Sequence, residues 1–195
     1  TAEEKSEKAV VYDSVLPVTP AQMREIMLGL RFLSKDQVMI YAKEEFNETQ
    51  MSYIRYGFGN KLSMEQVKIY AKPEFTYEQM SQILDGFKNN LTTEQVLLYA
   101  NPQFSEEQMI EILGGLTNGL SIDEVKLYAD PKFNYYQMGK IKIGLLQGLP
   151  LEQVKVYAKP EIYFGQMAEA IFGFENGLTI EQVEMGLKPE FSHLP

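Results

Sequence analysis

The chain has 195 residues, of which 45% are hydrophobic and 12% aromatic, a composition typical of one folded domain rather than of a disordered chain. Its 18 basic and 27 acidic residues give a net charge of −9, which disfavours sequence-independent binding to nucleic acid or anionic lipid. Cysteine is absent and His193 is the single histidine, so disulfides, thiolate metal sites and most histidine chemistry are excluded. No apolar run is long enough to cross a membrane.

The chain repeats itself with a period of 29 residues. Three short phrases carry the repeat, and only the first interval between glutamine–methionine pairs is one residue shorter. The methionines of these pairs are Met23, Met51, Met80, Met109, Met138 and Met167. The valines that follow glutamine or glutamate are Val38, Val67, Val96, Val125, Val154 and Val183, and the tyrosines that precede alanine are Tyr41, Tyr70, Tyr99, Tyr128 and Tyr157. Because three phrases share one period, the sequence predicts a tandem array.

In chain order, the array begins with a degenerate half-repeat over residues 1–18, where Ser6, Val10 and Tyr12 imitate a cap, the N4 residue and a core residue. Since the chain starts at Thr1 without an initiator methionine, we expect a fragment or a processed form. Six repeats follow, over residues 19–46, 47–75, 76–104, 105–133, 134–162 and 163–191. A tail over residues 192–195 ends the chain, and the final face has no repeat to cover it, so pairing of two copies there is an alternative.

Each repeat predicts two helices. In residues 76–104, Thr76 and Gln79 form a capping box, and an apolar stripe then runs from Met80 to Phe87. Asn89-Asn90 predict a left-handed stop, and a short helix after Thr92 ends before Pro102. The sequence therefore predicts an all-α fold, an α-α superhelix (solenoid) of six two-helix repeats with a degenerate N-terminal half-repeat.

One glycine recurs inside the long helix of every repeat. Since an interior glycine costs about 1 kcal/mol relative to alanine, we expect close contact there between the two helices of a repeat. These glycines are Gly29, Gly57, Gly86, Gly115, Gly144 and Gly173.

The phrases over Glu65–Phe75 and Gln79–Phe87 resemble tandem helical repeats of about 29 residues in uncharacterised bacterial proteins, a resemblance that implies no activity. In layout alone, the repeat is also similar to those of mitochondrial transcription termination factors and transcription-activator-like effectors, which bind duplex DNA through basic surfaces. In this chain the corresponding surface, the first turn of each short helix, is acidic, so the sequence predicts no nucleic-acid partner. Its acidic residues are Asp36, Glu65, Glu94, Asp123, Glu152 and Glu181.

These acidic residues are interpreted as favourable charges at helix N-termini, with a cation or basic-partner ridge as the alternative. The repeated tyrosines are interpreted as core residues with the hydroxyl at the edge, and a binding ladder is the alternative. No catalytic or metal-binding motif occurs, so the sequence predicts neither an enzyme, a metal site nor a cofactor.

Positions that vary between repeats suggest where a partner binds. Tyr56 and Phe172 precede the repeated glycine, at a position that the repeat does not need for its stripe. The predicted partner-binding residues are Arg55, Tyr56, Asp85, Ile143 and Phe172. The sequence thus predicts a non-enzymatic scaffold that binds a protein or peptide along an extended face, without membrane insertion. The alternative is a carbohydrate or small-ligand module that uses exposed tyrosines.

Overall fold

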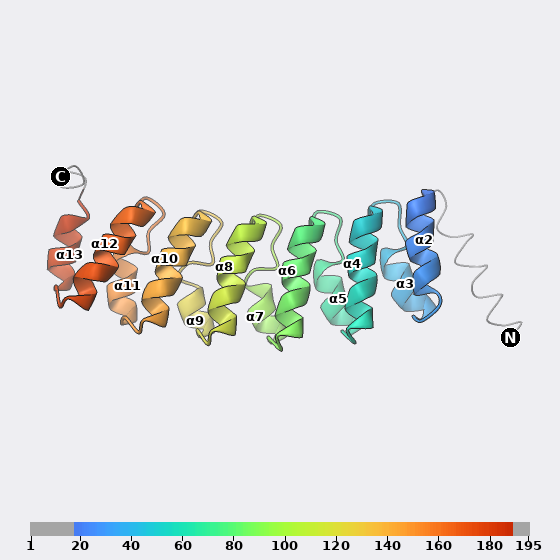
Figure 1. The fold of residues 1–195 in the computed structure, drawn as a ribbon, viewed down its shortest axis with the longest axis horizontal. Coiled ribbons are helices and arrows are strands. Elements are labelled where there is room, and N and C mark those ends of the chain that lie inside the picture. Colours follow the sequence, from blue (N-terminus) through green and yellow to red (C-terminus); the bar gives the residue numbers. More distant parts are fainter. Residues whose placement is uncertain (1–17, 189–195) are drawn as a thin grey trace, which may run out of the picture. The chain divides into compact units, whose positions relative to one another are not determined.

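Every regular element that the computed structural model describes is a helix (Figure 1). The description covers residues 18–188 and contains twelve helices and no strand, so the all-α prediction is confirmed for this part of the chain. The helices are α2 (Pro20–Gly29), α3 (Lys35–Tyr41), α4 (Glu48–Gly59), α5 (Met64–Tyr70), α6 (Tyr77–Lys88), α7 (Thr93–Leu97), α8 (Glu106–Thr117), α9 (Ile122–Val125), α10 (Tyr135–Leu146), α11 (Leu151–Tyr157), α12 (Phe164–Glu175) and α13 (Ile180–Gly186). The predicted capping segment, apart from Val18, and the tail with His193 lie outside the described residues.

Long and short helices alternate, and they form two compact units. The N-terminal unit holds residues 18–93 and 100–102, and the C-terminal unit holds residues 94–99 and 103–188. In the first, α4 packs between α2 and α6, while α3 and α5 pack against α4. In the second, α10 packs between α8 and α12, and α11 contacts both α10 and α12. Each unit therefore consists of a row of long helices backed by short ones (Figure 1).

Most helices begin with the capping box that the sequence predicts. At α6, the Gln79 backbone N–H donates to the Thr76 hydroxyl, and the Thr76 N–H donates to the Gln79 side chain at 2.9 Å. Two helices depart from this pattern. The N-cap residue makes no side-chain hydrogen bond at α11, which follows Pro150, or at α12, which follows Tyr163, although at α12 the Tyr163 backbone N–H still donates to the Gln166 side chain at 3.2 Å.

From α4 onward, the turn after each long helix contains one residue with a positive φ angle. In the turn after α10 this residue is Gly148, and the next residue, Leu149, donates its N–H to the Gly144 carbonyl at 3.1 Å, which gives a Schellman motif. The positive-φ residues are Lys61, Asn90, Gly119, Gly148 and Gly177. The predicted left-handed stop is thus confirmed.

A buried glutamine joins the start of one long helix to the loop that leads into the next. The Gln137 amide donates to the Pro160 carbonyl at 2.9 Å and to the Ile162 carbonyl at 2.7 Å, while its oxygen accepts from the Asn134 N–H. The buried members of this set are Gln22, Gln50, Gln79, Gln108 and Gln137. The methionine after each glutamine is completely buried except at Met23, which is half-buried, so the predicted core role is confirmed for the other five.

Candidate functional site

The five repeated tyrosines lie in the core, and each side chain is completely buried. In four of them the hydroxyl occupies the space that a β-carbon on the repeated glycine of the preceding long helix would need. These tyrosine–glycine pairs are Tyr41 with Gly29, Tyr70 with Gly57, Tyr128 with Gly115 and Tyr157 with Gly144. The predicted edge position of the hydroxyl is therefore wrong, and so is the binding-ladder alternative. The close contact at the glycine is confirmed, but a tyrosine side chain makes it.

Burial also determines what these phenols can do chemically. It raises the pKa of the Tyr70, Tyr128 and Tyr157 hydroxyls above the ordinary value of 10, so they stay neutral at physiological pH. The Tyr70 hydroxyl donates to the Tyr53 carbonyl at 3.5 Å. Those of Tyr128 and Tyr157 have no hydrogen-bond partner within the described residues. Their role is packing rather than ligand binding.

In the N-terminal unit, the structure brings together two of the predicted binding residues, Tyr56 on α4 and Asp85 on α6. Tyr56 is 51% exposed, and Asp85 is partly exposed and pairs with Lys88 at 2.9 Å. The Asp85 carboxylate and, to a smaller degree, the Tyr56 hydroxyl raise the pKa of Lys88. A large ring thus lies beside an ion pair on the adjoining helix.

Arg55 has a structural contact that the sequence interpretation missed. Its Nε and Nη2 atoms both lie 2.9 Å from the same Glu25 carboxylate oxygen, so the side chain links α4 to α2. Three repeats later, Lys142 of α10 pairs with Glu111 of α8 at 2.7 Å in the same arrangement. The sequence does contain a signal for this contact, because in both cases a glutamate is followed by a basic residue about one repeat later.

In the C-terminal unit, the predicted residues Ile143 and Phe172 occupy neighbouring long helices, α10 and α12. Ile143 is 42% exposed and Phe172 is 68% exposed. Each directly precedes a buried glycine, Gly144 or Gly173, so its own side chain is directed away from the gap beside the glycine. Both units therefore expose an apolar side chain at the same position of the repeat.

A second group of aromatic side chains lies at the N-terminal ends of α10 and α12. Tyr136 stacks on Phe164 with ring centroids 5.1 Å apart. Tyr135 extends this group from one side and Tyr163 from the other, at centroid distances of 4.0 Å to Tyr136 and 4.2 Å to Phe164. We call these four residues the aromatic row. Their mutual contact could not be predicted from the sequence, because spacing within a helix does not show which rings of two helices meet.

The six repeated acidic residues in the first turns of the short helices, Asp36, Glu65, Glu94, Asp123, Glu152 and Glu181, are all exposed. The pKa of Glu65 and of Glu181 is lowered, first by a hydrogen bond from the residue's own backbone N–H and then by the N-cap hydroxyl. Glu152 pairs with Lys155 at 2.8 Å. These contacts are those of helix-capping charges. Within residues 18–188, no three acidic or histidine side chains come together in a way that could hold a metal ion.

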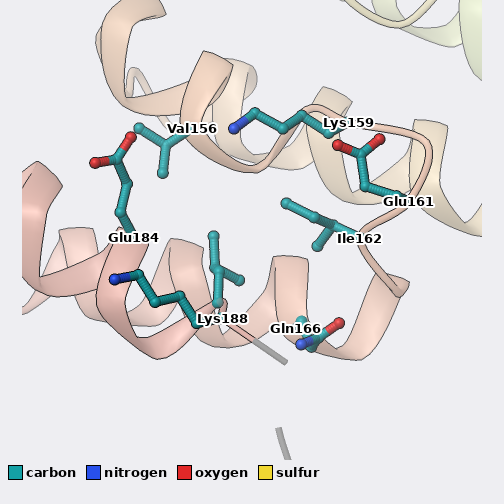
Figure 2. A pocket seen from close by; sticks show the side chains of 8 residues that line it. Val156, Lys159, Glu161, Ile162, Gln166, Glu184 and Lys188 are labelled. Atoms are coloured by element: carbon teal, nitrogen blue, oxygen red, sulfur yellow. The ribbon is translucent and has the colours of Figure 1, made fainter. Parts of the chain in front are cut away.

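A hollow of about 600 Å³ lies between α11, the loop after it and α13 (Figure 2). Ile162 points into it, and the charged side chains of Lys159, Glu161, Glu184 and Lys188 surround it (Figure 2). Opposite charges alternate around this hollow, and no catalytic pair of side chains faces it. It lies where the described chain ends, at Lys188.

None of the described helices has the length and apolar character needed to span a membrane. Comparison with protein-family models, curated proteins and solved structures gives no match to this chain. The function must therefore be argued from the residues themselves.

Proposed function

We propose that the chain is a non-enzymatic helical-repeat scaffold that binds a protein or peptide along an extended face. In this proposal the six repeats form one α-α superhelix, of the kind found in the bacterial tandem repeats that the sequence resembles. The uninterrupted 29-residue period from Met51 to Val183 supports a continuous array. Small-angle scattering tests the architecture. We expect an elongated particle, and a compact sphere of the same mass would contradict the array.

The observation that carries the binding function is the exposure of Tyr56, Ile143 and Phe172 at one position of the repeat. Packing within the repeat does not need a large side chain there, since the equivalent residue in another repeat is Gly114. Exposed aromatic and aliphatic side chains that recur along a repeat surface are the anchors that protein partners use.

The two units offer different neighbours for these anchors. In the N-terminal unit, the Asp85–Lys88 pair lies near Tyr56 and can hydrogen-bond to a polar segment of the partner. Arg55, held by Glu25, acts at the edge of this face as a positioning residue that fixes α4 against α2. In the C-terminal unit, Ile143 and Phe172 form the apolar part. The proposal assigns no catalytic residue and no cofactor.

The test compares two pairs of alanine substitutions of equally exposed apolar residues. Tyr56→Ala with Phe172→Ala should weaken binding of a captured partner by about tenfold or more, with an unchanged helical circular-dichroism signal. The control, Leu97→Ala with Met185→Ala, removes exposed side chains of the short helices and should bind normally. Equal losses in both variants would refute the assignment of the face.

Carbohydrate binding is the alternative function, and the exposed rings of Tyr136 and Tyr163 are the observation that favours it. A glycan array with the same protein distinguishes the two. Strong retention of one glycan class, together with no loss of affinity for it in the Tyr56→Ala, Phe172→Ala variant, would replace the protein-binding proposal.

A further inference from the structure

The first turn of α12 departs from those of the other long helices. Every other long helix follows a Ser, Thr or Asn cap, whereas α12 follows Tyr163, which makes no capping side-chain hydrogen bond. The first turns of α4, α6 and α8 contain glutamate, whereas those of α2, α10 and α12 contain none. Each departure weakens a helix end, because caps and N-terminal carboxylates stabilise it.

Gly165 is a further departure at the same place. A β-carbon at Gly165 would lie 3.1 Å from the Tyr163 ring, which is closer than ordinary contact. The absent side chain therefore gives the Tyr163 ring room to lie against the first turn of α12. Tyr163 at the cap and Gly165 in the first turn, neither of which favours helix stability, thus combine to hold a ring in one place, which is typical of a functional surface.

The aromatic row presents two of its rings to solvent. Tyr136 is 52% exposed and Tyr163 is 61% exposed, while Tyr135 and Phe164 are partly covered. Tyr136 is held by its stack on Phe164, and Tyr163 is held between Phe164 and Gly165. The two exposed rings are therefore fixed in position before any ligand arrives, which reduces the entropy lost on binding.

The net charge of the unit that contains these rings favours a cation. Among the described residues, the C-terminal unit has 13 acidic and 7 basic residues, a net charge of −6, whereas the N-terminal unit has 9 of each and is neutral. Glu107 lies in the first turn of α8, a helix that packs against α10, and after the larger effect of the hydrogen bond with Tyr136 its charge also contributes to raising the pKa of Tyr135. Hydrogen bonds from Ser105 and its own backbone lower the pKa of Glu107, which keeps it ionised.

We propose that the aromatic row binds an arginine-bearing segment of a basic peptide, with one guanidinium group against the exposed part of the Tyr136 ring, on the side of Glu107, and another against the Tyr163 ring. Electron-rich ring faces attract cations, and a planar guanidinium stacks on rings as an ammonium group cannot. The N-terminal ends of α10 and α12 carry partial positive charge, which repels a cation placed directly over their first turns. We therefore place the guanidinium group at Tyr136 on the side of Glu107. The inference rests on the proposed function for the peptide nature of the partner, but it uses another surface.

The test uses a synthetic peptide of alternating glycine and arginine, with a matched peptide in which neutral citrulline replaces every arginine. Titration calorimetry with the full chain at low salt should show binding of the arginine peptide and at least about tenfold weaker binding of the citrulline peptide. Absence of binding by the arginine peptide, or equal affinity for both peptides, would overturn the proposal. Tighter binding of a proline-rich peptide or of a glycan would also overturn it.

Variants locate the site. Tyr163→Ser restores the residue type that caps the other long helices, so weaker binding in this variant cannot be attributed to unfolding, and we expect about a tenfold loss. Tyr136→Phe should retain binding, because the ring face remains. Glu107→Gln should weaken binding several-fold, whereas the control Glu175→Gln, at the other end of α12, should not.

The variant Tyr56→Ala with Phe172→Ala separates this inference from the proposed function. It should bind the arginine peptide normally. If it loses the peptide while Tyr163→Ser retains it, the aromatic row is not the site, and the face around Tyr56 and Phe172 is supported instead. Loss of the peptide only in Tyr163→Ser and Glu107→Gln supports the aromatic row.

Discussion

The hydroxyl group of Tyr157 lies in the space that a β-carbon of Gly144 would occupy. One residue is in the short helix α11 and the other is in the long helix α10, so the pair fixes how closely the two helices pack. The hydroxyl is buried without a hydrogen-bond partner. The glycine is therefore needed because of the tyrosine oxygen, which suggests that the two residues can be exchanged only together.

A double-mutant cycle tests this coupling. Gly144→Ala alone should destabilise the protein by about 1–3 kcal/mol, because the new methyl group overlaps the Tyr157 hydroxyl. Tyr157→Phe alone should be nearly neutral, since it removes an unpaired buried hydroxyl. The double variant should recover most of the loss, because the methyl group fills the vacated space and alanine favours the helix. Urea unfolding measures all three, and additive effects would contradict the coupling.

The helical architecture could be predicted from the sequence because its signals are local. Caps such as Thr76, the left-handed stop at Asn90 and the buried stripe through Met80 each depend on residues within a few positions. The direction of the Tyr157 hydroxyl could not be predicted in this way. It depends on the spacing of two helices, which the stripe pattern indicates but does not fix.

The candidate sites show the same division. The exposure of Phe172 follows from its place outside the apolar stripe. The contact between Arg55 and Glu25, by contrast, joins two long helices and depends on how those helices are aligned side by side. The stack of Tyr136 on Phe164 likewise joins α10 to α12, and only coordinates show which rings meet.

The buried amide of Gln137 provides a second prediction. In the wild type, the Pro160 and Ile162 carbonyl oxygens accept two hydrogen bonds from the Gln137 amide. Gln137→Glu keeps the shape of the side chain, but at pH 7 it places a carboxylate against these two oxygens. We expect a loss of about 2–4 kcal/mol in the free energy of unfolding, from two lost bonds and a buried charge. Burial should raise the pKa of the new carboxyl group, so the loss should shrink as the pH falls towards 4.

Gln182→Glu is the matched control for this substitution. Gln182 forms the same capping box at α13 but is exposed, and Glu124 already performs that capping role at α9. The control should change the unfolding free energy by less than about 0.5 kcal/mol. Denaturant unfolding at pH 7 and pH 4.5 measures both variants. A Gln137→Glu protein as stable as the control at pH 7 would show that the two carbonyl contacts contribute little.

The buried tyrosines predict a loss of stability at alkaline pH. Tyr70, Tyr128 and Tyr157 have pKa values raised by burial in the folded state, whereas in the unfolded chain they ionise near pH 10. Above pH 10 the folded state holds more protons than the unfolded state, so the unfolding free energy falls as the pH rises, and below pH 10 these groups have no such effect. Well above pH 10, each tyrosine should contribute a slope of about 1.4 kcal/mol per pH unit.

Urea unfolding at pH 8, 9.5 and 11 measures this slope. Tyr157→Phe should reduce it by one tyrosine's share, whereas Tyr56→Phe, which changes an exposed ring, should leave it as in the wild type. The comparison removes the effects of lysine deprotonation and of the growing negative charge, which are common to all three proteins. Equal slopes in the three proteins would show that Tyr157 ionises as readily when folded as when unfolded.

The last prediction concerns the helix end at which Tyr163 replaces a cap. Tyr163→Ser should create the side-chain hydrogen bond that α12 lacks and stabilise the protein by about 0.5–1 kcal/mol, since some ring contact with Phe164 is lost in exchange. Gly165→Glu alone should give no gain, because its β-carbon meets the Tyr163 ring. In the double variant the ring is absent, so the glutamate can stabilise the N-terminus of α12 and the total gain should exceed that of Tyr163→Ser by a further 0.3–1 kcal/mol or so. Thermal unfolding of the three variants measures the series. A double variant no more stable than the wild type would show that Tyr163 and Gly165 do not weaken the helix. Their presence would then no longer indicate that stability is lost there for the sake of binding.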